Sequence, residues 1–304
     1  MANFIAIGLF TGFIYSLVAL GYTLVYGILR LINFAHSEVF MCGAFGGYFY
    51  LREFVNPNVV PSGVDSVYWV VTGLLVAGVV GGIVAILLER FAYRPLRRRN
   101  APPLTYLISA IGASYFLINF VGKEFGRYST ALPLAYTNRI VGRPFGAVVT
   151  TYNLIVMVAA ILLFVFLDFT VNRTKMGRGI RAVAQDQQMA SLMGVDINRT
   201  IATTFALGGV LGGAAGFLFA MSSGVSSTMG FIPALYAFTA AVLGGIGNIR
   251  GAMLGGIVLG IAETLPIYWL HQIWLEEVIA FGILIVILIF RPTGILGERL
   301  GRTA

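Results

Sequence analysis

Charged side chains are scarce in this chain of 304 residues: they make up 11% of it, whereas apolar residues make up 58%. A soluble globular protein carries roughly 25% charged residues, so this chain has too little polar surface to cover itself against water. Its mean hydropathy is +0.89, and its apolar stretches have room for the ~20 residues that a helix needs to cross a hydrocarbon core. Lipid is therefore the expected solvent, which excludes a soluble binding role.

Several kinds of reactive site are missing as well. The single cysteine, Cys42, excludes a disulfide framework and argues against a thiolate metal site. Two histidines are too few for a multi-histidine metal site, and the two lysines, Lys123 and Lys175, do not follow the glycine spacing of a phosphate-binding loop. We therefore expect no catalytic residue, no metal and no cofactor in this chain. We also expect no ATP hydrolysis through a phosphate-binding loop of its own.

Continuous apolar runs, rather than in–out alternation, favour helices over a β-barrel. The predicted fold is an all-α polytopic transmembrane bundle of about 8–10 helices, with interrupted helices and a cytoplasmic coupling helix, in a single domain over residues 1–304. The seventh and eighth apolar runs are short and meet at a glycine-rich break, so residues 232–268 could instead form one re-entrant pair. The predicted crossings are residues 4–29, 37–54, 68–89, 104–122, 151–172, 200–222, 232–246, 251–268 and 275–290.

Arginine placement predicts the orientation. Arginines crowd residues 90–99, residues 173–199 and residues 291–302, the last of which include Arg299 and Arg302. With nine crossings these segments share one side, which the positive-inside rule makes cytoplasmic. The net charge of +8 then has a topological role and does not indicate nucleic acid.

The N-terminus and the loop at about 123–150 are then external. This loop conflicts with the rule, because it carries Lys123, Arg127, Arg139 and Arg143. Its polar run around Asn138 predicts a folded external segment.

Glycines recur every four residues and so share helix faces, which favours close helix packing in lipid. Internal packing is the preferred interpretation of these stripes, and a moving or subunit-facing surface is the alternative. The stripes are Gly208, Gly212 and Gly216, then Gly78 and Gly82, Gly251 and Gly255, and Gly256 and Gly260.

Two segments place polar residues and glycines inside apolar stretches: residues 27–38 and residues 241–251. The first segment resembles the start of a helix, in which Ser37 would be the N-cap residue and Glu38 would lie in the first turn. It is either a tight cytoplasmic turn with ordinary capping or a broken helix whose free backbone groups line a translocation route. Interrupted segments in both halves of a chain indicate the central site of a transporter.

Isolated carboxylates give two further candidates. Glu263 lies inside an apolar run, where an ionised side chain costs at least ~2.5–3.5 kcal/mol, so it should face protein or water. Asp168 lies near a helix end and is expected to pair with Arg173. The candidate path or gating residues are Asn33, His36, Glu38, Gly244, Gly245, Gly247, Asn248 and Glu263.

Residues 174–196 form a helix-sized cytoplasmic stretch that Gly194 would end. On a helix, Ala182, Met189, Ala190 and Met193 can share one side. A helix lying on the membrane surface is the alternative, but such helices favour bulky Trp or Phe anchors, which this stretch lacks. A knob of small residues that enters a partner's groove is the preferred hypothesis.

The stretch GRGIRAVAQDQQMASLMGVD, residues 177–196, is similar to the cytoplasmic coupling loop of the permeases of bacterial branched-chain amino acid importers. Residues 19–38 resemble the first block of that family and residues 241–263 its last, with Ser37 where the family commonly has glycine. The chain looks like the shorter of the two usual permease partners. The resemblance implies an ATPase-coupling role, within a loop at about 173–199, for Gly177, Arg178, Arg181, Ala182, Asp186, Ala190 and Gly194.

The resemblance also implies an ATP-binding-cassette importer in the bacterial inner membrane. The expected partners are a second related permease, two ATPases that bind ATP and magnesium, and an external substrate-binding protein. Its expected cargo is branched-chain or other hydrophobic or neutral amino acids, with urea or short amides as the alternative. An intramembrane enzyme and a passive channel are remoter alternatives; the enzyme would have to use His36, Glu38 and Glu263.

Overall fold

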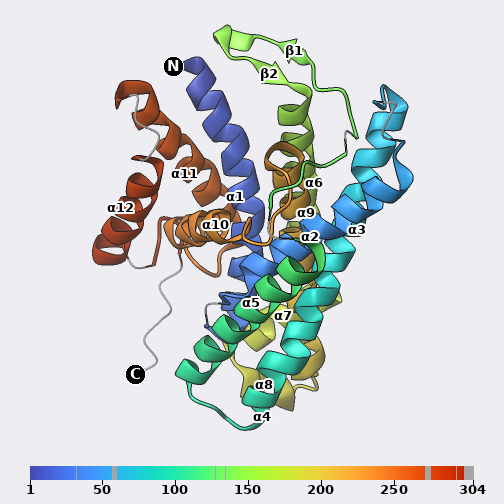
Figure 1. Cartoon of the computed structure of the whole chain (residues 1–304). Coiled ribbons are helices and arrows are strands. Elements are labelled where there is room, and N and C mark those ends of the chain that lie inside the picture. The colour runs from blue at the N-terminus through green and yellow to red at the C-terminus, as the bar shows by residue number, and fades with distance from the viewer. Residues whose placement is uncertain are drawn as a thin grey trace.

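The computed structural model describes residues 1–31, 33–56, 60–126, 128–133, 135–270, 275–291 and 293–297, and most of them are helical (Figure 1). The long helices are α1 (Ala2–Leu29), α2 (His36–Phe54), α3 (Val64–Leu88), α5 (Pro103–Phe125), α6 (Thr151–Arg173), α9 (Ile197–Ser223), α10 (Phe231–Gly244), α11 (Ile249–Leu270) and α12 (Leu275–Phe290). The shorter elements are a π-helical turn (Glu89–Tyr93), α4 (Arg94–Arg98), β1 (Ile140–Gly142), a 3-10 turn (Pro144–Gly146), β2 (Val149–Thr150), α7 (Lys175–Gln185) and α8 (Gln187–Leu192).

The predicted all-α polytopic membrane fold is confirmed, and each of the predicted crossings coincides with a helix. Among the described residues, five helices are long and apolar enough to span a bilayer: α1, the continuous unit of α3 and α4, α5, α6 and α9. Helix α10 is shorter and runs across the bundle in Figure 1 rather than along it. Residues 232–268 therefore contain two helices of different direction, joined by a tight turn.

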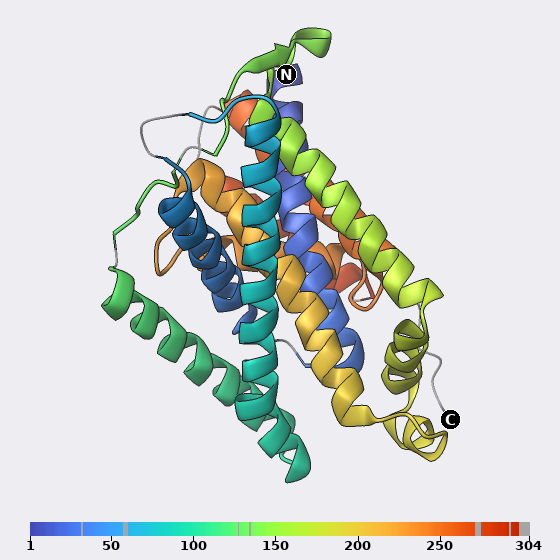
Figure 2. The ribbon, with the colours of Figure 1, turned by 90° about the vertical axis from the view of Figure 1, so that its right-hand side faces the viewer.

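Helices α1 and α9 form the centre of the bundle. Helix α1 packs against α11, α9 and α10, while α9 also packs against α3 and α2 (Figure 2). Residues Leu17–Leu20 of α1 are completely buried. Burial on all sides explains why α1 is apolar around its whole circumference instead of along one stripe.

Glycine stripes set the distances between these helices. A Cβ added at Gly213 of α9 would lie 3.0 Å from the Cα of Gly81 in α3 and closer still to the carbonyl of Ala77. A Cβ at Gly260 of α11 would lie 2.6 Å from the Cα of Gly12 in α1. Gly260 belongs to a predicted stripe, and Gly216 of the predicted stripe in α9 packs in the same way on the backbone of Phe40 in α2. Backbone meets backbone at these positions, as the packing interpretation of the stripes predicts.

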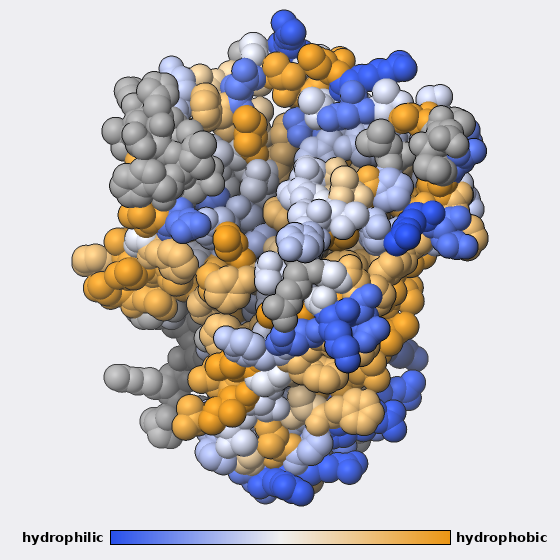
Figure 3. Space-filling model, in the orientation of Figure 1, coloured by the Kyte–Doolittle hydropathy of each residue, from blue (hydrophilic) through white to orange (hydrophobic). Residues whose placement is uncertain are grey.

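The outward faces of the peripheral helices carry large apolar side chains. In Figure 3 apolar residues gather on both flanks and in the lower part of the visible face, around a paler centre with a hydrophilic patch. Such a surface would aggregate in water, but it matches the hydrocarbon core of a bilayer. Among the exposed residues are Val71, Leu75, Val79 and Ile83 of α3, Leu104, Ile108 and Phe116 of α5, Leu162, Val165 and Phe169 of α6, and Ile285, Ile289 and Phe290 of α12.

The two ends of the bundle differ. The N-terminus and the β1–β2 hairpin lie at one end, and α4 and α8 lie at the other (Figure 1). The arginine-rich segments 90–99 and 173–199 therefore share an end, as predicted. Arg127, Arg299 and Arg302 lie outside the described residues.

The loop at 123–150 is folded, as expected. Strand β1 pairs antiparallel with β2. The loop is also tied to the end of α9, since Thr130 and Val225 exchange backbone hydrogen bonds of 2.9 and 2.8 Å.

The predicted pairing of Asp168 with Arg173 is wrong. Asp168 Oδ1 lies 3.4 Å from Arg250 Nε at the start of α11, and it accepts a 2.9 Å hydrogen bond from Asn172. Residues four apart share a helix face whereas residues five apart do not. Asn172 is thus placed to reach Asp168, and Arg173 points elsewhere.

The glycine packing generates a stability prediction. Gly213→Val should lower the free energy of unfolding by roughly 1–3 kcal/mol or more, because the new side chain would meet the backbone of α3. Gly112→Val in α5 is the matched control, since a Cβ there has nothing within 4 Å. Thermal unfolding of the detergent-solubilised chain measures both variants. Equal stability of the two would contradict the close packing of α3 and α9.

Candidate functional site

The break between α1 and α2 is held by a buried asparagine. Helix α1 ends where Arg30 adopts the left-handed conformation, with φ 53° and ψ 30°. Asn33 Oδ1 accepts a 2.6 Å hydrogen bond from the Tyr93 hydroxyl and a 3.1 Å bond from the Ala35 amide. Because Tyr93 belongs to the π-helical turn after α3, the break is fixed to a different part of the bundle. It is therefore more than a local turn.

Ser37 does not cap α2, so that prediction is wrong. The helix begins at His36, one residue earlier, and its N-cap residue Ala35 has no side chain that could cap. The Ser37 hydroxyl lies 2.9 Å from the Phe34 carbonyl and 2.6 Å from Glu38 Oε2. It has one hydrogen to share between these two acceptors.

His36 is buried between α1 and α9. Its ring meets the Tyr22 ring edge-on at 4.8 Å between centroids. A Cβ at Gly212 would lie 3.2 Å from His36 Nε2, so the glycine makes room for the imidazole. Among the described residues, Nε2 has no hydrogen-bond partner. His36 thus packs in the core and does not line the cavity described below.

Glu38 is also buried, and its carboxylate bonds to hydroxyl groups. Its side-chain partners are Ser37, at 2.6 Å, and Ser114 of α5. Within the part of the chain that the structure describes, no arginine or lysine forms an ion pair with Glu38. The two serines that bond this carboxylate both line a cavity.

The cavity has a volume of about 120 Å³ and lies beside the break, between α1, α2, α5 and α10. Its wall is mainly aromatic and aliphatic, with a few hydroxyl groups, which suits a small molecule that has an apolar body and a polar end. The lining residues are Tyr22, Phe34, Ser37, Ile111, Ser114, Tyr115, Phe231, Ala234, Leu235 and Phe238. Sequence reasoning missed the contribution of α5, for which the only signal was a serine and a tyrosine within an apolar run.

The second break, between α10 and α11, has its backbone groups satisfied by the segment after α12. The carbonyls of Leu243 and Gly244 accept hydrogen bonds of 2.8 and 3.0 Å from the amides of Ile295 and Leu296. Asn248 Nδ2 donates to the Leu296 carbonyl at 2.8 Å. These bonds replace the partners that the last turn of a helix lacks.

Asn248 also caps α11, since its Oδ1 accepts from the amides of Arg250 and Gly251 at 3.0 and 3.1 Å. Gly245 and Gly247 adopt positive φ angles of 106° and 97°, and Gly244 packs directly on the backbone of Gly251. The predicted residues of this segment therefore build the turn itself.

The two breaks lie next to each other, as expected of interrupted helices at a central site. A Cβ at Gly27, near the end of α1, would lie 3.9 Å from the Cα of Gly247. Glu263 lies elsewhere: its neighbour Thr264 packs against Gly8, in the N-terminal half of α1. The structure thus brings together the two interrupted segments and leaves Glu263 apart from them.

The predicted coupling segment, residues 174–196, contains two helices rather than the single helix predicted. Asp186 is extended, with φ −151° and ψ 114°, and separates α7 from α8. Its Oδ1 accepts from the amides of Gln188 and Met189 at 2.7 and 3.0 Å, so it caps α8. The sequence contained this signal, because aspartate is a favoured N-cap residue. Gly194 follows α8 with φ 83°, which confirms that it ends the segment.

Helix α7 and the first residue of α8 are attached to the ends of two long helices. The backbone of Gly177 packs on the Thr170 and Val171 carbonyls, and the Arg181 guanidinium donates to the Val171 carbonyl. Gln187 Nε2 donates to the Ile28 carbonyl at 3.3 Å, in the last turn of α1. A displacement of this segment would therefore reach α6 and α1 directly.

Three large apolar side chains are exposed on α8 and at its C-cap, beside the exposed polar residues Gln188 and Ser191. Leu192 and Met193 are 80% and 84% exposed, and Met189 is also exposed. The expectation that Met189 and Met193 share a side with Ala190 is wrong, because Ala190 is buried. Of the other predicted coupling residues, Arg178 and Asp186 are exposed and Ala182 is half-buried.

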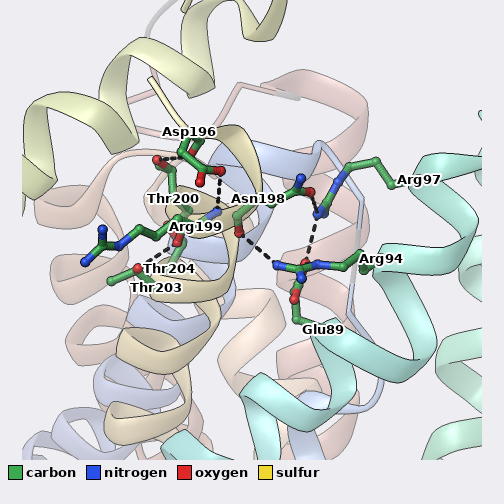
Figure 4. A network of polar contacts seen from close by, with 9 residues as sticks. All are labelled: Glu89, Arg94, Arg97, Asp196, Asn198, Arg199, Thr200, Thr203 and Thr204. Carbon is green, nitrogen blue, oxygen red and sulfur yellow. Dashed lines mark hydrogen bonds and ion pairs between the residues drawn. The ribbon is translucent and has the colours of Figure 1, made fainter. Parts of the chain in front are cut away.

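A network of polar contacts connects α3 to the start of α9 (Figure 4). The carboxylate of Glu89, only 1% exposed, lies 2.9 Å from Arg97 Nη2 and 3.4 Å from Arg94 Nε. Arg97 Nη2 also donates to Asn198 Oδ1 at 2.8 Å. Asp196 caps α9 by accepting from the Arg199 amide at 3.0 Å. This network, the Glu89 clasp, joins α3 to the residues that follow the coupling segment.

Comparison with known proteins identifies close relatives. A family model described as branched-chain amino acid transport system / permease component matches residues 4–288. The chain is 41% identical to the high-affinity branched-chain amino acid transport system permease protein LivH of Escherichia coli K12, over 96% of this chain and 94% of that protein. It is also 41% identical to the corresponding protein BraD of Pseudomonas aeruginosa, with the same coverage of 96% and 94%. A probable LivH of Methanocaldococcus jannaschii is 28% identical over 92% of this chain and 88% of its own length.

The hydrogen bond at the first break generates a prediction. Tyr93→Phe removes the hydroxyl that donates a hydrogen bond to the buried Asn33 side chain. This change should lower the free energy of unfolding by roughly 1–3 kcal/mol. It should also speed amide exchange at residues 33–36. Tyr128→Phe, at an exposed tyrosine, is the control and should leave both quantities unchanged. Hydrogen exchange followed by mass spectrometry checks this, and slow exchange in the Tyr93 variant would argue against the assigned role of the bond.

Proposed function

The chain belongs to the permease component family of branched-chain amino acid transport systems, and from this premise we propose how its parts move substrate. It is a multi-pass inner-membrane permease subunit of an ATP-binding-cassette importer, and it is not an enzyme.

The proposed cargo is leucine, isoleucine or valine. The names of the relatives support this choice, and so does the cavity beside the first break, which is the observation that carries it. Its aromatic and aliphatic wall can accept a branched side chain. The hydroxyl oxygens of Ser37 and Ser114, whose hydrogens face Glu38, can accept hydrogen bonds from an ammonium group. Urea or short amides would gain little from the apolar wall.

The proposed partners are a second related permease, two ATPases and an external binding protein. The exposed apolar surface of α8 supports an ATPase contact, because apolar side chains at the arginine-rich end would otherwise face water. ATP and magnesium would be bound by the ATPases. In this orientation the N-terminus and the β1–β2 hairpin are external and α8 is cytoplasmic.

We propose alternating access as the mechanism. Closure of the ATPase pair displaces α7 and α8, and three attachments transmit this movement: Arg181 to α6, Gln187 to α1, and the Glu89 clasp to α3. Helix α1 leads directly to the first break, and the turn after α3 contacts that break through Tyr93 and Asn33. Helix α6 contacts the second break through Asp168 and Arg250. The segments around Asn33–Glu38 and Gly244–Gly251 then rearrange about the path.

Reconstitution tests the function directly. The full complex in proteoliposomes should accumulate radiolabelled leucine only when ATP and the binding protein are both present. Turnover of a substrate by the purified chain without ATPases would indicate an intramembrane enzyme. Uptake down a gradient without ATP would indicate a channel, and uptake of urea in preference to leucine would replace the proposed cargo.

The exposed surface of α8 generates one prediction. Leu192→Asp should weaken ATPase binding roughly 10- to 100-fold, because burial of a leucine side chain is worth about 1.5–3 kcal/mol. Val64→Asp places the same charge at an exposed apolar position at the start of α3, and it should bind the ATPase normally. Co-purification or interferometry with the isolated ATPase measures both. Normal binding by the Leu192 variant would remove α8 from the interface.

The cavity generates another prediction. Ser114→Phe fills space beside the first break and should reduce ATP-driven leucine uptake at least about tenfold, equivalent to about 1.4 kcal/mol in the transport barrier. ATPase binding should remain normal. Gly112→Phe on the same helix, where a Cβ meets nothing within 4 Å, should transport normally. If the Ser114 variant transports at the wild-type rate, the cavity is not part of the path.

A further inference from the structure

Four arginines surround a pocket that the transport mechanism does not use. The pocket has a volume of about 400 Å³ and lies along the π-helical turn and α4, at the arginine-rich end of α3. It is lined by Arg90, Phe91, Arg94, Pro95, Arg98 and Arg99. Arginine forks are suited to phosphate, because they can donate two parallel hydrogen bonds to its oxygens.

Among the residues that the structure describes, most of this positive charge has no acidic partner. Glu89 pairs with Arg94 and Arg97. Within the described ranges, Arg90, Arg98 and Arg99 form no ion pair. Three guanidinium groups within ten residues repel one another unless an anion lies between them.

The pocket continues an apolar stripe on the outer face of α3. Val79, Ile83 and Leu87 are exposed at intervals of four residues, and Phe91, 73% exposed, follows them at the pocket. The side chains above the arginines therefore match acyl chains, whereas the arginines match a charged headgroup. Because this stripe faces the hydrocarbon core, the pocket lies next to lipid. An acidic loop of a soluble ATPase would contact the arginines alone, and the experiment below distinguishes it from a lipid.

We propose that this pocket binds the phosphate headgroup of an anionic phospholipid such as phosphatidylglycerol, with its acyl chains along α3. The arginines hold the phosphate at the membrane surface, and Phe91 lies at the boundary between headgroup and chains. Phosphate binding here would also hold α4 in place beside the Glu89 clasp. The proposal rests on the pocket alone and does not depend on the identity of the transported substrate.

Native mass spectrometry of the full-length chain, titrated with phosphatidylglycerol or phosphatidylcholine, tests the site. The wild type should bind the first phosphatidylglycerol at least roughly tenfold more tightly than phosphatidylcholine, since each arginine near a membrane surface is worth about 1 kcal/mol toward anionic lipid. The triple variant Arg90→Gln, Arg98→Gln, Arg99→Gln should lose this preference. The control triple Arg173→Gln, Lys175→Gln, Arg199→Gln removes the same charge from the same end and should retain it.

Four results would overturn the proposal. They are equal affinity for the two lipids, an equal loss in both triple variants, displacement of the lipid by millimolar inorganic phosphate, and loss of ATPase binding in the first triple variant without loss of lipid binding. The third result would assign the pocket to free phosphate, and the fourth would assign it to the ATPase. If the first triple variant is not monodisperse, Arg98→Glu changes one exposed side chain and should show the same loss of preference.

Discussion

A chain in lipid must satisfy every backbone polar group from within, because no water is present to do so. Wherever one of its helices stops inside the bundle, another part of the protein has to supply the missing hydrogen bonds. At the first break, the side-chain oxygen of Asn33 accepts from the Ala35 amide, and the Tyr93 hydroxyl holds that oxygen in place. At the second break, Asn248 and the amides of Ile295 and Leu296 supply the bonds. The arrangement of the breaks depends on these few bonds.

The partners at the two breaks come from different places, which gives the breaks different connections. The first is linked through Tyr93 to the turn after α3, and therefore to the Glu89 clasp and the coupling segment. The second is linked to residues 295–296, after the last helix. Movement at the end of the bundle that holds α4, α7 and α8 consequently has a short route to the first break, whose residues Phe34 and Ser37 line the cavity.

The sequence was sufficient for the fold class, the helix positions and the glycine packing, because hydropathy and small-residue spacing are local properties. It also located both breaks and the end of the coupling segment at Gly194. It could not show that Asp168 pairs with Arg250, or that Ser114 approaches Glu38, since these contacts join residues far apart in the chain. The division of the coupling segment at Asp186 could be predicted in principle, because aspartate is a favoured N-cap residue, but residues 174–196 were predicted as one helix.

The π-helical turn at Glu89–Tyr93 has a consequence for how this region can vary. A π turn contains one residue more than an α turn, and each residue of an α-helix rotates the chain by about 100°. The extra residue rotates α4 relative to α3. The Tyr93 hydroxyl can therefore bond Asn33 while Arg97 of α4 pairs with Glu89. Deleting one residue here would restore a regular helix and turn α4 away from Asn198. Homologous chains that keep both contacts must therefore keep the length of this segment, even where its composition changes.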